Sequence, residues 1–155
     1  MRTALKLLTL LAALTVPSLV QADTPRTLTG AAHNVTVGVR AAATLIVDQK
    51  PDGTYALSGG FDNINLAGDV TGTGRAPTFE DGVSACAPGH ECILFTGQIM
   101  LDSRAGFADG TATTFILSLD IEQALGTATG TYHIGLLPGF PFEQYGIVQL
   151  AVPTS

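Results

Sequence analysis

Hydrophobic and polar residues alternate one by one along much of this chain, and this alternation constrains the fold more than any other feature. Phe115, Leu117 and Leu119 are large and apolar, whereas the alternate positions from 114 to 120 are polar except for one isoleucine. A similar alternation, less strict, runs through residues 92–101 and 127–134. Because successive side chains of a strand point to opposite faces of a sheet, these segments are predicted to be half-buried antiparallel strands.

Further strands are predicted at residues 54–58, 63–71 and 145–152. Residues 35–47 carry valine, alanine or leucine at every odd position. A single strand of that length would be unusually long, and Gly38 is a natural point for a bend. This segment is therefore expected to form either one long bent strand or two strands.

Turn-forming residues separate the predicted strands. Residues 51–53 (Pro-Asp-Gly) supply one hairpin turn, residues 105–110 end a second hairpin, and residues 121–126 are expected to hold one helical turn ended by Gly126. Eighteen glycines and no tryptophan also fit strands and turns better than helices. The sequence predicts an all-β antiparallel meander of seven or eight strands, most simply a closed up-and-down β-barrel, with a two-sheet β-sandwich as the second choice.

The N-terminus has the pattern of a secretory signal peptide. Arg2 and Lys6 precede an apolar run at residues 7–16, and a small residue, Ala22, ends the segment. The run is too short to span a bilayer as a helix, and no later segment is long and apolar enough to do so. We expect residues 1–22 to be cleaved and residues 23–155 to form one exported domain, periplasmic or extracellular; the alternative is a buried N-terminal helix.

The only two cysteines, Cys86 and Cys92, lie six positions apart with a Pro-Gly pair between them. An even number of cysteines in an exported protein predicts a disulfide. A metal site is the alternative, since His90 lies between the two thiols and Met100 is a soft ligand nearby in the sequence. No second Cys/His pair lies close to them, so the disulfide is favoured and no metal or cofactor is expected.

The charge of the chain excludes some functions. The formal net charge is −6, and the segment after residue 22 is more acidic still because two basic residues precede it. Such a surface argues against binding nucleic acid or an anionic membrane. The three histidines His33, His90 and His133 occur singly, and Lys50 lies in a predicted turn. No catalytic constellation is recognised, so no catalytic residue is assigned.

An uncharged loop at residues 135–142 is the most unusual segment. It holds two prolines, two glycines and four large apolar residues, although connections between strands normally lie on the surface. The loop is expected either to plug one end of the barrel or to act as a lid over a ligand cavity or a docking patch for another protein. The candidate binding residues in and beside this loop are Tyr132, His133, Leu136, Leu137, Phe140, Phe142 and Glu143.

These observations favour an exported, non-catalytic β-barrel that binds a small, largely apolar ligand or a protein partner at the end covered by residues 135–142. Two other functions stay open at this point. One is an enzyme with a small acid/base site inside the barrel, for example His133 with an acidic partner. The other is a structural, envelope-interacting protein with a filled core.

Overall fold

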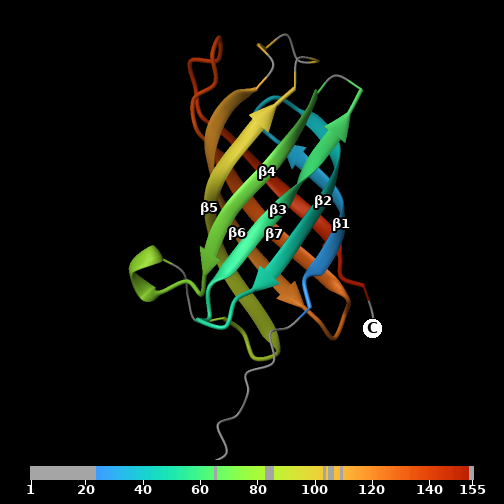
Figure 1. The fold of residues 1–155 in the computed structure, drawn as a ribbon, viewed down its shortest axis with the longest axis vertical. Coiled ribbons are helices and arrows are strands. Elements are labelled where there is room, and N and C mark those ends of the chain that lie inside the picture. Colours follow the sequence, from blue (N-terminus) through green and yellow to red (C-terminus); the bar gives the residue numbers. More distant parts are fainter. Residues whose placement is uncertain are drawn as a thin grey trace, which may run out of the picture.

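Eight antiparallel strands close into a barrel in chain order, each strand pairing with the next and β8 with β1 (Figure 1). The computed structural model describes residues 24–64, 66–82, 86–102, 104, 107–108, 110–153, so the predicted signal peptide lies outside the described residues. The prediction of a closed up-and-down barrel is confirmed, with eight strands rather than seven. The strands are β1 (Arg26–Asn34), β2 (Val39–Gln49), β3 (Tyr55–Asn63), β4 (Leu66–Arg75), β5 (His90–Leu101), β6 (Thr111–Glu122), β7 (Thr127–Ile134) and β8 (Gln144–Ala151).

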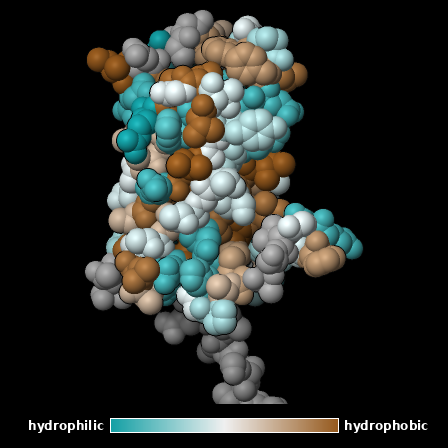
Figure 2. All heavy atoms as spheres, turned by 180° about the vertical axis from the view of Figure 1, so that it is seen from behind, coloured by the Kyte–Doolittle hydropathy of each residue, from teal (hydrophilic) through white to brown (hydrophobic). Residues whose placement is uncertain are grey.

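The alternation predicted for the strands separates the interior of the barrel from its outer wall. In β6, residues 113, 115, 117, 119 and 121 are buried, and the residues between them are exposed or half-buried. In β8 the same alternation runs without a break from Gln144 to Ala151. The outer wall seen from behind mixes hydrophilic and hydrophobic side chains (Figure 2). The large apolar residues of the strands therefore gather inside the barrel.

The segment 35–47 forms neither one long strand nor two. Residues 35–38 make the turn between β1 and β2, and β2 begins at Val39. The Asn34 side-chain oxygen accepts hydrogen bonds from the backbone N–H groups of Thr36 (3.1 Å) and Val37 (3.3 Å), and Gly38 takes a positive φ of 72°. Asn34 and Gly38 thus make the chain turn at residues 35–38, although the apolar residues at every odd position had suggested a strand there.

Other strand boundaries also differ by a few residues from the predicted ones. The strand expected at 54–58 extends to Asn63, and the strand expected from residue 63 begins at Leu66, because a turn lies between them. The expected helical turn at 121–126 is a tight turn after the end of β6, in which Gly126 N–H donates to Gln123 O (3.1 Å). The described chain has one short 3-10 helix, η1 (Phe79–Asp81), and none of its helices is long and apolar enough to cross a membrane.

One end of the barrel is filled by large, fully buried side chains, and we call it the solid half. The largest fully buried side chains all lie in the half that contains the start of β1 and β5 and the end of β2 and β6. The Phe95 ring lies across Gly74, where a Cβ atom would stand 2.4 Å from the ring, and Tyr55 meets the ring edge-on with centroids 6.3 Å apart. A glycine on the neighbouring strand therefore makes room for an aromatic ring. The fully buried set is Phe95, Leu28, Ile93, Leu119, Ile121 and Val47.

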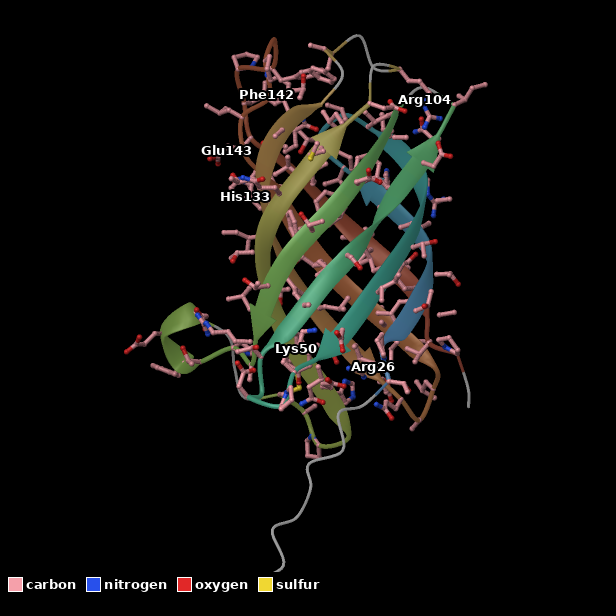
Figure 3. The ribbon with its side chains drawn as sticks, viewed as in Figure 1. Arg26, Lys50, Arg104, His133, Phe142 and Glu143 are labelled. Carbon is pink, nitrogen blue, oxygen red and sulfur yellow. A yellow bond between two sulfur atoms is a disulfide. The ribbon has the colours of Figure 1, made fainter. Side chains whose placement is uncertain are left out.

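A half-buried ion pair lies at the same end. Arg26 donates to both carboxylate oxygens of Glu91 (2.5 and 2.7 Å), and the labelled Arg26 lies at the lower end of the barrel in Figure 3. Burial raises the pKa of the Glu91 carboxyl, but the hydrogen bonds and charge of Arg26, with a hydrogen bond from Tyr55, outweigh burial and lower it overall. The predicted disulfide is confirmed beside this end, joining Cys86 to Cys92 at the entrance to β5.

Candidate functional site

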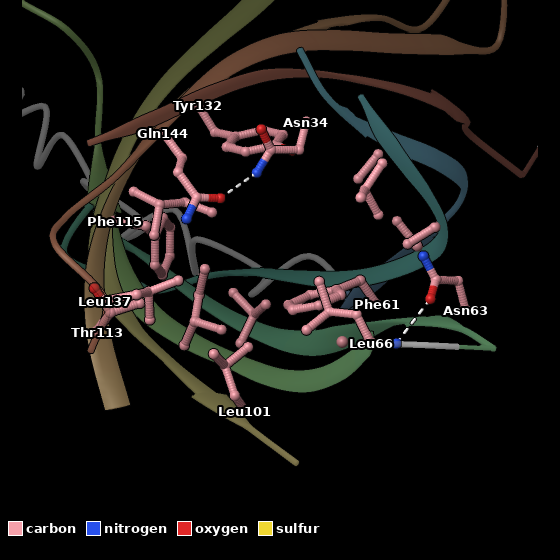
Figure 4. A pocket seen from close by; sticks show the side chains of 18 of the residues that line it. Asn34, Phe61, Asn63, Leu66, Leu101, Thr113, Phe115, Tyr132, Leu137 and Gln144 are labelled. Carbon is pink, nitrogen blue, oxygen red and sulfur yellow. Dashed lines mark hydrogen bonds between the residues drawn. The ribbon is translucent and has the colours of Figure 1, made fainter. Parts of the chain in front are cut away.

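The other half of the barrel is hollow. A cavity of about 450 Å³ lies among the ends of the strands, and none of the six fully buried side chains of the solid half borders it (Figure 4). Its wall on β1 and β2 includes the small residues Ala32, Ala41 and Ala43, where other strands carry leucine or phenylalanine. These alanines leave the space unfilled. The other apolar residues of the wall are Val37, Val39, Leu45, Phe61, Leu66, Val70, Ile99, Leu101, Phe107, Phe115, Leu117, Ile134, Leu137, Phe140 and Val148.

The apolar loop 135–142 partly covers the mouth of the cavity. Pro138 and Gly139 occupy the centre of a turn closed by the Phe140 N–H, which donates to Leu137 O (3.0 Å), and Gly139 has the positive φ of 81° that a type II turn requires. This turn aims Leu137 and Phe140 at the mouth, where both border the cavity. The Phe107 ring from the loop between β5 and β6 packs against Phe140, with centroids 5.9 Å apart. The two loops thus form an apolar rim.

The remaining apolar residues of the loop do not border the cavity. Leu136 is 64% exposed and Phe142 is 45% exposed. The Phe142 ring meets Phe140 edge-on, with centroids 6.0 Å apart. Of the four apolar loop residues predicted as binding residues, the structure brings two to the cavity and leaves two outside it.

The predicted neighbours Tyr132 and His133 lie on opposite sides of the wall. Tyr132 borders the cavity, and its ring covers Gly146, where a Cβ atom would stand 2.1 Å from the ring. Burial raises the pKa of the Tyr132 hydroxyl to about 12. Its protonated, uncharged form therefore faces the cavity at neutral pH.

His133 and Glu143 point away from the barrel (Figure 3). The His133 ring stacks on Tyr145 with centroids 4.6 Å apart, and its Nε2 lies 3.0 Å from a Glu143 carboxylate oxygen. The two are an imidazole and a carboxylate on the outer wall, without hydrogen-bond geometry between them. They contribute nothing to the cavity lining.

Two buried amides in the cavity wall were missed by the sequence predictions. Asn34, at the end of β1, donates from its side-chain nitrogen to the Gln144 side-chain oxygen at 2.5 Å, as Figure 4 shows. Both residues lie at inward positions of their strands, and Gln144 shares its face with the apolar Val148 and Leu150. A polar residue on the apolar face of a strand is the sequence signal that would have found them.

Two further polar groups belong to the wall. Thr113 donates its hydroxyl to the backbone oxygen of Leu136 (3.2 Å) and so ties the start of the apolar loop to β6. Arg104 lies at the rim, where it binds the carboxylates of Asp102 and Asp62 and the backbone oxygen of Asn63. The hydrogen bond that Arg104 donates to the Asp102 carboxylate is the main reason that the pKa of Arg104 is raised. The charge of this arginine is therefore already balanced by two acidic neighbours.

The site contains little that would hold a metal. The one group of three potential ligands within the described ranges is Cys86, Cys92 and Asp120, in the solid half. Its two sulfur atoms are bonded to each other, so neither is a thiolate that could bind a metal. Among the described residues that border the cavity there is no histidine, aspartate, glutamate or cysteine.

Comparison of the chain with protein-family models, with curated proteins and with solved structures gave no match. The functional assignment therefore depends on the cavity and its lining.

Proposed function

We propose that this protein is an exported carrier or receptor that binds a small, largely apolar molecule inside its β-barrel. The observation that carries this proposal is the contrast between the two halves: one holds the largest fully buried side chains, and the other holds a cavity of about 450 Å³ behind an apolar rim. Natural binding pockets for small molecules have volumes of roughly 300–1,000 Å³ and mostly apolar walls. The cavity has both properties.

The chemistry of the wall supports an apolar ligand. Each square ångström of apolar surface removed from water contributes roughly 25 cal/mol, so a molecule enclosed by the wall gains most of its affinity from burial. The one charged side chain among the described lining residues, Arg104, is neutralised at the rim. A charged ligand group held deep in such a wall would lose its hydration without gaining a counter-ion.

The two other functions have less support. An acid/base site inside the barrel needs two proton-transferring groups, and the described part of the cavity wall offers Tyr132 as its one weak acid. The His133–Glu143 pair faces outward, beside the exposed ring of Tyr145. A structural protein with a filled core would not need the cavity.

Export is part of the proposal and is supported by the disulfide, since disulfides persist in oxidising compartments and are rare in the cytosol. The test is expression of the whole chain with its own N-terminus in a secreting host. The product is expected outside the cytoplasm, beginning at Asp23. A product retained in the cytoplasm with residues 1–22 attached would refute export.

Ligand binding is tested by titrating the purified protein with N-phenyl-1-naphthylamine, an uncharged probe whose fluorescence rises in apolar surroundings. We expect saturable binding to one site. Ala43→Leu adds a side chain inside the cavity and should weaken binding at least about tenfold, equivalent to about 1.4 kcal/mol.

The matched control is Ala42→Leu, at the next position of β2, where the side chain faces outward and is exposed. This variant should bind the probe as the wild type does. Equal weakening in both variants, or no saturable binding by the wild type, would contradict the proposal.

A further inference from the structure

The amide pair at the mouth has a fixed orientation. The Asn34 side-chain oxygen accepts two backbone N–H groups of the β1–β2 turn, so its side-chain nitrogen must be the atom that faces Gln144. A donor facing Gln144 requires the Gln144 oxygen as its acceptor. The turn therefore fixes the orientation of both amides: the Gln144 oxygen accepts from Asn34, and the Gln144 nitrogen does not take part in this contact.

The same constraint leaves the Gln144 nitrogen for the cavity. Gln144 is only 5% exposed, and its two N–H groups have no hydrogen-bond partner among the residues that the structure describes. In Figure 4 this nitrogen points away from Asn34, toward the side of Phe115. A ligand that fills the cavity shields these N–H groups from water, so its binding costs free energy unless the ligand supplies an acceptor.

We propose that Gln144 reads a hydrogen-bond acceptor on the ligand, so that the preferred ligand is an uncharged carbonyl compound with an apolar body, such as a ketone, an ester or an amide. This inference rests on the proposed function. The carbonyl oxygen would accept from the Gln144 nitrogen while the apolar body fills the space along Ala41, Ala43 and Val148. A carboxylate is disfavoured because the one cation among the described wall residues, Arg104, is already paired with Asp62 and Asp102.

The test compares two molecules of nearly the same shape, 2-acetylnaphthalene and 2-isopropylnaphthalene, in which a carbonyl oxygen replaces a methyl group. Each displaces N-phenyl-1-naphthylamine from the wild type and from Gln144→Met, which keeps the length of the side chain and removes its donors. The ratio of the two dissociation constants should change by about tenfold in favour of the hydrocarbon when Gln144 is replaced. Using the ratio cancels the different solubilities of the two molecules in water.

The matched control is Gln149→Met. This is the same substitution in the same strand, but Gln149 is exposed on the outer wall and does not border the cavity. It should leave the ratio unchanged. A third molecule, 2-naphthoate, should bind more weakly than the ketone.

The outcomes separate the two proposals. If the wild type binds neither neutral molecule, the proposed function fails. If it binds both and Gln144→Met leaves the ratio unchanged, or if Gln149→Met shifts it equally, the inference about Gln144 is overturned while ligand binding stands. Equal binding of 2-naphthoate would overturn the preference for an uncharged ligand.

A measurement on the wild type alone covers the case in which Gln144→Met does not fold. The carbonyl stretching frequency of bound, ¹³C-labelled 2-acetylnaphthalene should lie below its value in a hydrocarbon solvent, because a hydrogen bond weakens the C=O bond. An unshifted frequency in the bound state would overturn the proposal.

Discussion

Two phenylalanines in neighbouring strands offer a matched test of the division between a solid and a hollow half. Phe95 in β5 is fully buried among the solid half, and its ring touches Gly74 and the Tyr55 ring. Phe115 in β6 is nearly as buried, but one side of it borders the cavity. Both rings point inward and both lie across a glycine of a neighbouring strand.

Replacing each phenylalanine with alanine should cost different amounts of stability. Removing a buried phenylalanine ring costs about 3–5 kcal/mol, and the cost rises with the number of lost contacts and the size of the cavity left behind. Phe95 also loses an edge-on aromatic contact worth about 0.5–1.5 kcal/mol. We expect Phe95→Ala to cost about 4–5 kcal/mol and Phe115→Ala about 2–3 kcal/mol, because a ring beside a void has fewer neighbours to lose.

The assay is urea unfolding of the oxidised protein, followed by circular dichroism. The dependence of the unfolding free energy on urea should be equal in both variants, so that the shift in midpoint reports stability alone. Equal costs for the two substitutions, or a larger cost for Phe115→Ala, would contradict the division of the barrel into a solid and a hollow half. Either result would mean that the side chains around Phe115 are packed as tightly as those around Phe95.

Four more predictions address the ends of the barrel. Glu91→Gln should lower the unfolding free energy by about 1–2 kcal/mol at pH 7, because the lowered pKa of Glu91 stabilises the fold while the carboxyl is ionised. The difference from wild type should shrink as the pH falls from the ordinary value of 4.5 through the lowered pKa of the folded protein. Burial raises the pKa of Tyr132 to about 12, so the unfolded chain loses this proton at a lower pH than the folded protein does. The unfolding free energy should therefore fall between about pH 10 and pH 12. Tyr132→Phe should remove that part of the fall, as measured by urea titrations at each pH. Replacing both Cys86 and Cys92 with alanine should cost about 2 kcal/mol in the same assay, the loop-closure value for so short a loop; no change would show that the bridge constrains little in the unfolded chain. Phe140→Ser should weaken the binding of N-phenyl-1-naphthylamine while the melting temperature stays within a few degrees, and a collapse of the melting temperature would instead identify the loop as a structural plug.

The alternation of residues predicted the fold well where large side chains mark one face. From Phe115 to Leu119 every inward residue is large, so β6 is visible in the sequence. The strand β1 is not, because its inward side chains include the small Ala32 and the polar Asn34. Small and polar inward residues also make the cavity and its amide pair, so the features that hid β1 from the prediction are the features that form the site.

The candidate site was predicted in part for a related reason. The apolar loop was recognisable because four large apolar residues in a connection require an explanation, and the structure brings Leu137 and Phe140 of this loop to the cavity. Successive side chains of a strand point to opposite faces, so His133 cannot line the cavity when its neighbour Tyr132 does. The role of Gln144 depends on the turn that follows β1, more than a hundred residues away in the chain, and sequence spacing carries no record of that contact.

The most direct test of a hollow, apolar half is diffraction from a crystal of the oxidised protein held under xenon pressure. Xenon enters dry apolar cavities and is excluded from packed cores. We expect xenon density in the space bordered by Ala43, Leu117 and Val148, and none around Phe95. Side chains filling that space, or a chain of ordered waters in place of xenon, would contradict the claim that this barrel encloses an apolar binding cavity.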